Sequence, residues 1–209
     1  QDNLALAFGD FDNDGLQDVF VPAYQSGEFS SLYRNLGNRR FEKVTDLPPV
    51  QELGSATGAS WGDCDNDVDY DFFVTFAGSR NQLYLKDGNG GFVRSEARDI
   101  LRYTGQNYAP SWIDFDEDGD LDVFVAEFLS DRPNLIFRND GNGEFVRLEN
   151  VFPGTNYSLG ATWGDYDNDG DMDLYVPNAN GENNYLYRND GRGNFTPITE
   201  GLLVSEGGH

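Results

Sequence analysis

Aspartate residues recur at alternate positions in four short segments of this chain, in the pattern D-x-D-x-D-x-x-x-D. The segments are DFDNDGLQD from Asp10 to Asp18, DCDNDVDYD from Asp63 to Asp71, DFDEDGDLD from Asp114 to Asp122, and DYDNDGDMD from Asp165 to Asp173. Alternate carboxylates on a tight loop present several oxygen ligands to one point, and Ca²⁺ takes about six to eight oxygens. The pattern therefore predicts a calcium-binding loop in each segment.

We expect the carboxylates at loop positions 1, 3, 5 and 9 and the backbone carbonyl at position 7 to hold the ion. The expected ligand residues are Asp10, Asp12, Asp14, Leu16 and Asp18; Asp63, Asp65, Asp67, Asp69 and Asp71; Asp114, Asp116, Asp118, Asp120 and Asp122; and Asp165, Asp167, Asp169, Asp171 and Asp173. Three to four Ca²⁺ ions are expected.

The second loop departs from the pattern at position 6. Val68 stands there, whereas the other loops have Gly15, Gly119 and Gly170. Glycine permits the sharp turn that such a loop needs, and a β-branched residue is costly at positive φ. The second loop is therefore expected either to follow a different path or to bind calcium more weakly.

Other metal sites fit the residues less well. An EF-hand needs a glutamate at position 12 and flanking helices, but this position holds Val21, Val74, Val125 and Val176 inside strand-like runs. Dense carboxylate cages suit calcium better than magnesium, and zinc and copper lack the histidine or cysteine ligands that they prefer. A hairpin without an ion is disfavoured because the clustered carboxylates would repel one another.

The spacing of the loops predicts the fold. Their first aspartates lie 53, 51 and 51 residues apart, which indicates one structural unit repeated four times. Each unit of about 51 residues is predicted to form four short strands. The first is a run that ends in an aromatic before the acidic loop, and the second is a run such as DVFV that begins at the last loop aspartate. The third contains an aromatic, at Tyr33, Tyr84, Phe137 or Tyr187, and the fourth follows a Gly-rich turn and begins at Phe41, Phe92, Phe145 or Phe195.

Such units are typical of β-propeller blades. The chain is predicted to be all-β, a single array of four-stranded antiparallel meanders with blades at about 1–53, 54–104, 105–155 and 156–209. One helical turn is possible between residues 96 and 103. In a meander, the acidic loop and the Gly-rich turn emerge at one end of the blade. The other end carries turns and blade links that differ between units, and a ligand is expected there.

Aromatic residues in these irregular segments are candidates for stacking on sugars. They are Tyr24, Phe29, Tyr108, Phe128 and Tyr157. The competing interpretation is that they only pack the links between blades. The sequence leaves open whether the ligand is a protein or a glycan.

The charge of the chain limits its partners. The formal net charge is −23, and 20 of the 37 acidic residues lie in the four loops. Phosphate backbones and anionic lipids would be repelled, so neither nucleic acid binding nor membrane insertion is expected. The lone Cys64 is expected to be a buried filler, and His209 is the only histidine. Histidine-based catalysis is therefore not expected, and a glycoside-cleaving carboxylate pair is the remaining enzymatic alternative.

The stretch WGDYDNDGDMDLYV from Trp163, the stretch LYRNDGRGNF from Leu186 and their counterparts resemble the FG-GAP or VCBS repeat family. This resemblance covers nearly the whole chain. It implies calcium-stiffened propeller blades, as in integrin α heads, bacterial surface proteins, cartilage-acidic-type proteins and some lectins, and an adhesion or recognition role. Members typically close with seven blades, so four blades predict a partial ring or a self-associating half-ring. Calcium dependence favours an extracellular, cell-surface or periplasmic location.

Overall fold

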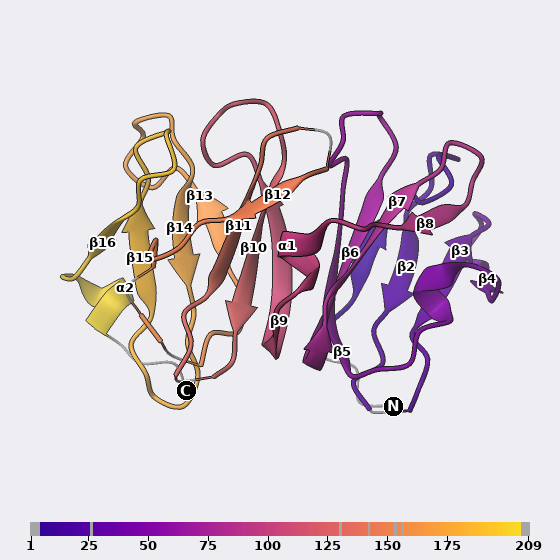
Figure 1. Cartoon of the computed structure of the whole chain (residues 1–209), viewed down its shortest axis with the longest axis horizontal. Coiled ribbons are helices and arrows are strands. Elements are labelled where there is room, and N and C mark those ends of the chain that lie inside the picture. Colours follow the sequence, from indigo (N-terminus) through magenta and orange to yellow (C-terminus); the bar gives the residue numbers. More distant parts are fainter. Residues whose placement is uncertain are drawn as a thin grey trace.

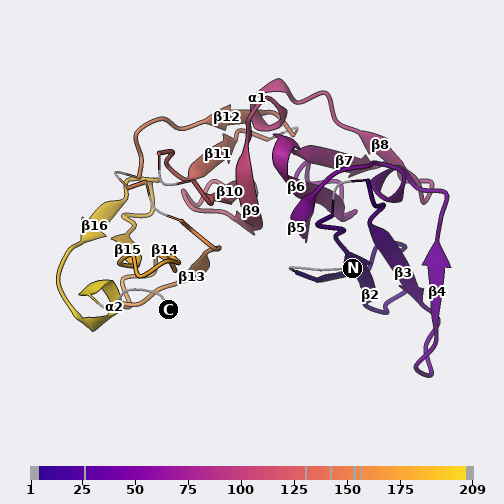
Figure 2. The same ribbon diagram turned by 90° about the horizontal axis from the view of Figure 1, so that it is seen from below.

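Short apolar runs bounded by aspartates and glycines form the strands of this protein. The computed structural model describes residues 5–25, 27–129, 131–141, 143–152, 154–155 and 157–205. Within these ranges the chain is built from antiparallel strands with three short helical segments, which confirms the all-β prediction. The strands form four successive units that follow an arch, with blade 1 at one end and blade 4 at the other (Figures 1 and 2).

Each blade contains four strands in chain order. Blade 1 has β1 (Ala7–Gly9), β2 (Asp18–Val21), β3 (Ser31–Asn35) and β4 (Phe41–Val44); blade 2 has β5 (Ala56–Gly62), β6 (Asp71–Arg80), β7 (Gln82–Lys86) and β8 (Phe92–Arg94); blade 3 has β9 (Thr104–Ile113), β10 (Asp122–Glu127), β11 (Leu135–Asn139) and β12 (Phe145–Arg147); blade 4 has β13 (Thr162–Gly164), β14 (Asp173–Val176), β15 (Tyr185–Arg188) and β16 (Thr196–Ile198).

The helical segments lie between or after the blades. A 3₁₀ turn (Pro48–Val50) links blades 1 and 2, and α1 (Arg98–Leu101) links blades 2 and 3 within the predicted turn. The last element, α2 (Leu202–Ser205), contacts β15. None of the described helices is long and apolar enough to cross a membrane.

The register within the blades agrees with the predicted repeat. The residue after the last loop aspartate pairs with the aromatic of the third strand in every blade: Val19 with Tyr33, Phe72 with Tyr84, Val123 with Phe137 and Leu174 with Tyr187. The fourth strand of blade 4 begins at Thr196, one residue after the predicted Phe195.

The link between blades 2 and 3 differs from the prediction. Irregular turns and blade links were expected at this end of the blades, but β6 continues to Arg80, and β9 already begins at Thr104. These extensions pair with each other, Ala77 with Gly105 and Arg80 with Thr104, so that blades 2 and 3 share one eight-stranded sheet. Thr75 and Phe76 in the middle of β6 are buried, whereas its last three residues are exposed, so the pairing with β9 and not side-chain burial accompanies the end of the strand.

The hydrophobic core lies in the three seams between blades. Alternate residues of each central strand point to opposite seams, as the two-residue period of a strand requires. Phe72 and Val74 pack toward blade 1, whereas Phe73 packs against Val123 and Val125 of blade 3. Phe124 enters the third seam with residues of blade 4. The runs at the start of β6 and β10 are therefore buried on both faces, whereas Val19 and Val21 of β2 and Tyr175 of β14, in the two end blades, are half-buried.

The strand directions place the two kinds of loop at opposite ends. In Figure 1 the arrows of β2, β6, β10 and β14 point downward, so the acidic loops that precede them lie at the top. The turns that follow these strands lie at the bottom. We call these the loop end and the turn end of the arch.

Candidate metal centres

The last aspartate of each acidic loop is buried and ties the loop to its blade. Asp122 accepts a 3.1 Å hydrogen bond from the backbone nitrogen of Phe115 and a 2.8 Å bond from that of Asn139, which ends β11. The same two bonds recur in the other blades at Asp18, Asp71 and Asp173. Each of the four residues is at most 1 % exposed. The acidic loop and the Gly-rich turn therefore meet at one carboxylate, as the meander topology predicts.

The first aspartate caps its own loop. Asp10 accepts hydrogen bonds from the backbone nitrogens of Asp14 (3.0 Å) and Gly15 (2.8 Å). The equivalent pair of bonds recurs at Asp63, Asp114 and Asp165. The loop position that precedes these donors is left-handed in every copy, with φ between 59° and 62° at Asn13, Asn66, Glu117 and Asn168. The four loops thus share one backbone path.

Three of the predicted carboxylates converge in each loop. Ligand atoms of positions 1, 3 and 9 lie within 4.8 Å of one another: Asp10, Asp12 and Asp18; Asp63, Asp65 and Asp71; Asp114, Asp116 and Asp122; Asp165, Asp167 and Asp173. The position 3 oxygens Asp12 Oδ1, Asp65 Oδ1 and Asp116 Oδ1 are buried without a hydrogen-bond partner in the described chain. A buried carboxylate oxygen without a donor is costly, and a hard cation would satisfy it. The residues therefore fit a calcium ion.

The position 5 carboxylates also bond to the backbone of their own loop, and their role as ligands stays a prediction. The position 5 carboxylates of Asp14, Asp67, Asp118 and Asp169 accept a hydrogen bond from the backbone nitrogen two residues ahead, at 2.8–3.2 Å, and are not among the converging groups. The role of the position 7 carbonyls of Leu16, Asp120 and Asp171 stays a prediction.

Position 7 side chains connect the blades. The Asp69 carboxylate accepts a 2.6 Å hydrogen bond from Asn13 of blade 1, and Asp120 accepts one of 2.5 Å from Asn66 of blade 2. This bond was not predicted from the sequence, although the asparagine at position 4 of the first two loops, Asn13 and Asn66, was a signal for it. Asp69 also lies 3.4 Å from Lys86 Nζ, so its carboxylate already has two partners.

The second loop follows the same path as the others. Val68 has φ = 76°, close to the 86°, 96° and 104° of Gly15, Gly119 and Gly170. Its backbone nitrogen donates to Asp63 as theirs do to the equivalent aspartates. Of the two expected alternatives, the different path is therefore wrong. The valine holds a strained backbone conformation, and such strain persists only when surrounding contacts maintain it.

Burial makes the clustered carboxylates harder to ionise in a loop without a cation. It raises the pKa of Asp122 to about 8 and that of Asp71 to about 6, against the opposing effect of their backbone hydrogen bonds. Burial, reinforced by neighbouring aspartates, also raises the pKa of Asp65 and Asp116. A bound divalent cation favours the ionised forms of all these groups.

The turn end brings together four of the five aromatic candidates. The hydroxyl oxygens of Tyr24 and Tyr108 lie 3.4 Å apart, the ring centroids of Tyr108 and Phe128 4.9 Å apart, and those of Phe128 and Tyr157 5.3 Å apart. All four are half-buried, so each retains some exposed surface. Phe29 lies apart from them, over a separate hollow lined by Ser30, Lys43 and Val50. We call Tyr24, Tyr108, Phe128 and Tyr157 the aromatic row.

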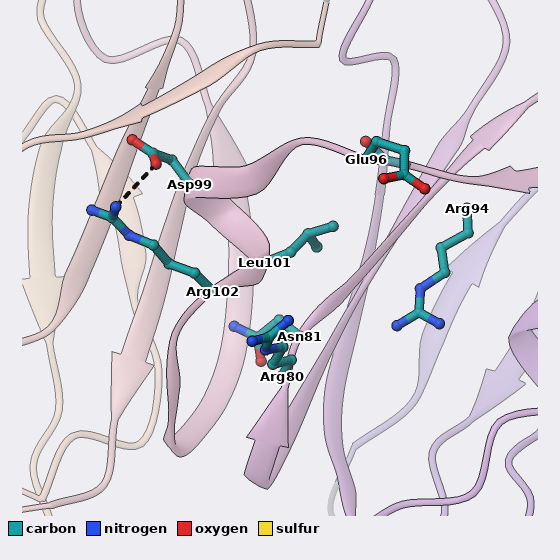
Figure 3. Close-up of a pocket in the computed structure, with 8 residues that line it drawn as sticks. Arg80, Asn81, Arg94, Glu96, Asp99, Leu101 and Arg102 are labelled. Carbon is teal, nitrogen blue, oxygen red and sulfur yellow. Dashed lines mark ion pairs between the residues drawn. The ribbon is translucent and has the colours of Figure 1, made fainter.

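A groove of about 610 Å³ is lined by residues of blade 2 and of the link to blade 3, and it shares no lining residue with the acidic loops or the aromatic row (Figure 3). Arg80, Arg94 and Arg102 line it together with Glu96 and Asp99. Arg102 pairs with Asp99 at 3.3 Å. The groove therefore carries both positive and negative side chains, unlike the acidic loops, whose clustered side chains are all carboxylates.

The enzymatic alternative needs a pair of carboxylates in a pocket outside the acidic loops, and the structure offers one such carboxylate. Glu127 is 2 % exposed, lines a hollow of about 270 Å³, and has a pKa raised by burial. The other lining residues, Tyr103, Thr104, Arg132, Pro133, Leu135 and Arg147, include no second acid. A carboxylate pair is therefore not assembled among the described residues at this place. His209 lies outside the described residues.

Comparisons with known proteins agree with the repeat. The FG-GAP-like repeat matches residues 10–74, 63–125 and 114–176. No protein of curated function matches the chain. Among solved structures, the chain is similar to a lectin of Agrocybe aegerita that specifically recognises non-reducing terminal N-acetylglucosamine, with 19 % identity and a TM-score of 0.57. The match covers 94 % of this chain and 51 % of the lectin, so the chain spans about half the length of that structure.

Proposed function

The chain belongs to the FG-GAP-like repeat family, and on this premise we propose that it is a non-enzymatic recognition module whose blades are stiffened by calcium. The observation that carries the proposal is the convergence of three carboxylates in every acidic loop, with a partnerless buried oxygen in three of them. The ion would be held by positions 1, 3 and 9, and its chemistry would be structural: it neutralises the cluster and joins the two strands that flank the loop.

Calcium binding would stabilise the folded chain by mass action. A site at one hundred times its dissociation constant adds about 2.7 kcal/mol to the free energy of unfolding. Thermal unfolding with calcium and with EDTA tests this proposal. We expect a large decrease in melting temperature on chelation, which calcium but not magnesium restores. An unchanged transition in EDTA contradicts it.

The ligand site of this module is the turn end. Its turns and links differ from blade to blade, whereas the loop end repeats the same bonds in each blade, as a scaffold does. The partner is a protein or a glycan, and the expected location is extracellular, on a cell surface or periplasmic. These environments hold enough calcium to fill weak sites.

A carbohydrate ligand is the second candidate, and the aromatic row favours it. Half-exposed rings from three blades offer flat apolar faces with a phenolic hydroxyl at either side, which suits a sugar ring with its polar edge. The solved relative that binds N-acetylglucosamine shares the fold. A glycan array tests the idea, with Tyr108→Ala and Phe29→Ala as a matched pair. Loss of binding in Tyr108→Ala alone supports it, and an array without hits removes it.

A further inference from the structure

Consecutive blades pack through similar contacts, in which one blade offers a receiving surface and the next blade inserts side chains. The receiving surface of blade 4 and the inserting surface of blade 1 are exposed at the two ends of the arch. In the first two seams a tryptophan from the first strand of one blade lies against a glycine of the preceding blade. A Cβ atom on Gly9 would lie 2.5 Å from Trp61, and one on Gly62 would lie 2.8 Å from Trp112. Real Cβ atoms do not approach so closely, so the tryptophan in these two seams leaves no room for a side chain at the glycine. The third seam has Ile113 at the equivalent position, and Ile113 and Trp163 pack against the same core there.

A hydrogen bond accompanies this seat in the later seams. Asn139 Nδ2 donates to the carbonyl oxygen of Cys64, and Asn189 Nδ2 to that of Phe115, both at 2.7 Å. The acceptor residue is at position 2 of the preceding loop. Its side chain is covered wherever a blade follows, since Phe11, Cys64 and Phe115 are at most 1 % exposed.

Blade 4 displays the receiving half of this contact. Gly164 occupies the seat position, and no atom of the described residues lies within 4 Å of a Cβ built on it. Tyr166, at position 2 of the same loop, is 46 % exposed. A hollow of about 320 Å³ lies here, lined by residues including Trp163, Gly164, Tyr166 and Leu203.

Blade 1 displays the inserting half. Phe8 corresponds to the tryptophans of the other blades and is 61 % exposed. Asn35 corresponds to Asn139 and Asn189. Its Nδ2 donates to Gln17 of its own blade, as theirs do to Leu121 and Met172. Asn139 and Asn189 each donate a further hydrogen bond to the preceding blade. Blade 1 has no preceding blade in this chain that could accept such a bond from Asn35.

We propose that blade 1 of one copy of this chain docks on blade 4 of a second copy, with Phe8 on Gly164 and Asn35 donating to the carbonyl of Tyr166. Two copies related by a twofold axis make this contact twice and leave neither end open, whereas unclosed repetition gives a filament. The hydrogen bond from a position 4 asparagine to a position 7 aspartate of the next blade cannot form in this pairing, because blade 1 has Leu16 at position 7. The seam between blades 3 and 4 has Glu117 and Asp171 at the equivalent positions, two acids that cannot form this bond as carboxylates, so the bond is not required.

Charge opposes the association. Each copy has a net charge of −23, and four Ca²⁺ ions would reduce it to about −15. We therefore expect assembly to be favoured by calcium and by salt, which screens the remaining repulsion.

Sedimentation velocity of the whole chain in calcium and physiological salt tests the proposal. The wild type should sediment at twice the 23.3 kDa monomer mass or more. Gly164→Leu fills an empty seat and Phe8→Ser removes the inserted ring, so each variant alone should be monomeric with an unchanged circular dichroism spectrum. Val93→Ser, which removes a 57 % exposed side chain on β8, should assemble as the wild type does.

Mixing provides the sharper test. Gly164→Leu keeps an intact blade 1 edge and Phe8→Ser an intact blade 4 edge, so an equimolar mixture should form a one-to-one heterodimer although neither variant assembles alone. Only a head-to-tail contact gives this rescue. A wild type that remains monomeric at every concentration, or an assembly that both variants leave intact, overturns the proposal.

Discussion

The backbone nitrogen of Val68 donates a 2.9 Å hydrogen bond to Oδ2 of Asp63, which places a valine in a loop conformation that the other three blades reserve for glycine. The side chain is 86 % exposed and contributes little packing. The strain at this position is therefore not offset by side-chain burial, and it bears directly on the stability of the second loop.

Replacing this residue should stabilise the protein. A non-glycine residue in the left-handed region costs about 1–2 kcal/mol, part of which glycine returns as entropy of the unfolded chain. We expect Val68→Gly to raise the free energy of unfolding by about 1 kcal/mol in urea titrations. Gly170→Val, at φ = 104° with open space around it, should lower it. Equal stability of both variants and the wild type would show that this conformation is not strained.

Two aspartates of one loop should differ in their effect on calcium. Asp116 belongs to a converging cluster and has a partnerless oxygen, whereas the Asp120 carboxylate bonds to Asn66 of the preceding blade. Isothermal titration should show that Asp116→Asn weakens calcium binding at this loop about tenfold or more. Asp120→Asn keeps the backbone carbonyl and should retain the wild-type stoichiometry. A similar loss in both variants would place the ion elsewhere in the loop.

The calcium-free protein should lose stability as the pH rises. Asp71 and Asp122 have folded-state pKa values of about 6 and 8, above the ordinary 3.8. The folded state thus binds more protons than the unfolded chain between about pH 4 and 8, and the free energy of unfolding falls with rising pH across that window. Melting temperatures in EDTA from pH 4 to 8.5 measure this.

Calcium should reverse that dependence. It requires ionised carboxylates, so binding releases protons, and the stability of the calcium-loaded protein should rise over the same range. A pH indicator dye in weak buffer at pH 7 should report the released protons. If calcium addition releases none, Asp122 is already ionised and our assignment of its raised pKa is wrong.

Removing an asparagine that bonds to the preceding blade should lower the free energy of unfolding more than removing one that bonds within its own blade. Asn139 is fully buried and donates to Cys64 of the preceding blade, whereas the acceptor of Asn35 Nδ2 among the described residues is Gln17 of its own blade. Asn139→Ala leaves a buried carbonyl oxygen without a donor, which costs about 1–3 kcal/mol. In a monomeric Gly164→Leu background, Asn35→Ala should cost clearly less. Equal losses in denaturant titrations would show that the contact to Cys64 contributes nothing.

Much of this molecule could be predicted from its sequence. The period of the acidic segments, the aromatic that closes each first strand and the glycines of each turn are local signals, and the blades and their register follow from them. The convergence of Asp114, Asp116 and Asp122 was also predictable, because alternate residues of one short loop define it. The continuation of β6 to Arg80 was not, because it depends on pairing with β9, which begins 24 residues later.

The sequence by itself determined the repeated unit, which is set by the period of 51 to 53 residues between acidic segments, and the residues available to a cation, which are set by the spacing inside each nine-residue loop. Only the tertiary structure decided that position 5 carboxylates turn to the backbone, that Val68 adopts the glycine conformation, and that Tyr24 meets Tyr108 from another blade. It also showed that Phe8 and Gly164 remain open at the two ends of the arch. The meeting of Tyr24 and Tyr108 depends on packing between distant segments. The backbone of Val68 and the position 5 carboxylates are fixed by hydrogen bonds within the folded loop, which residue spacing alone does not specify.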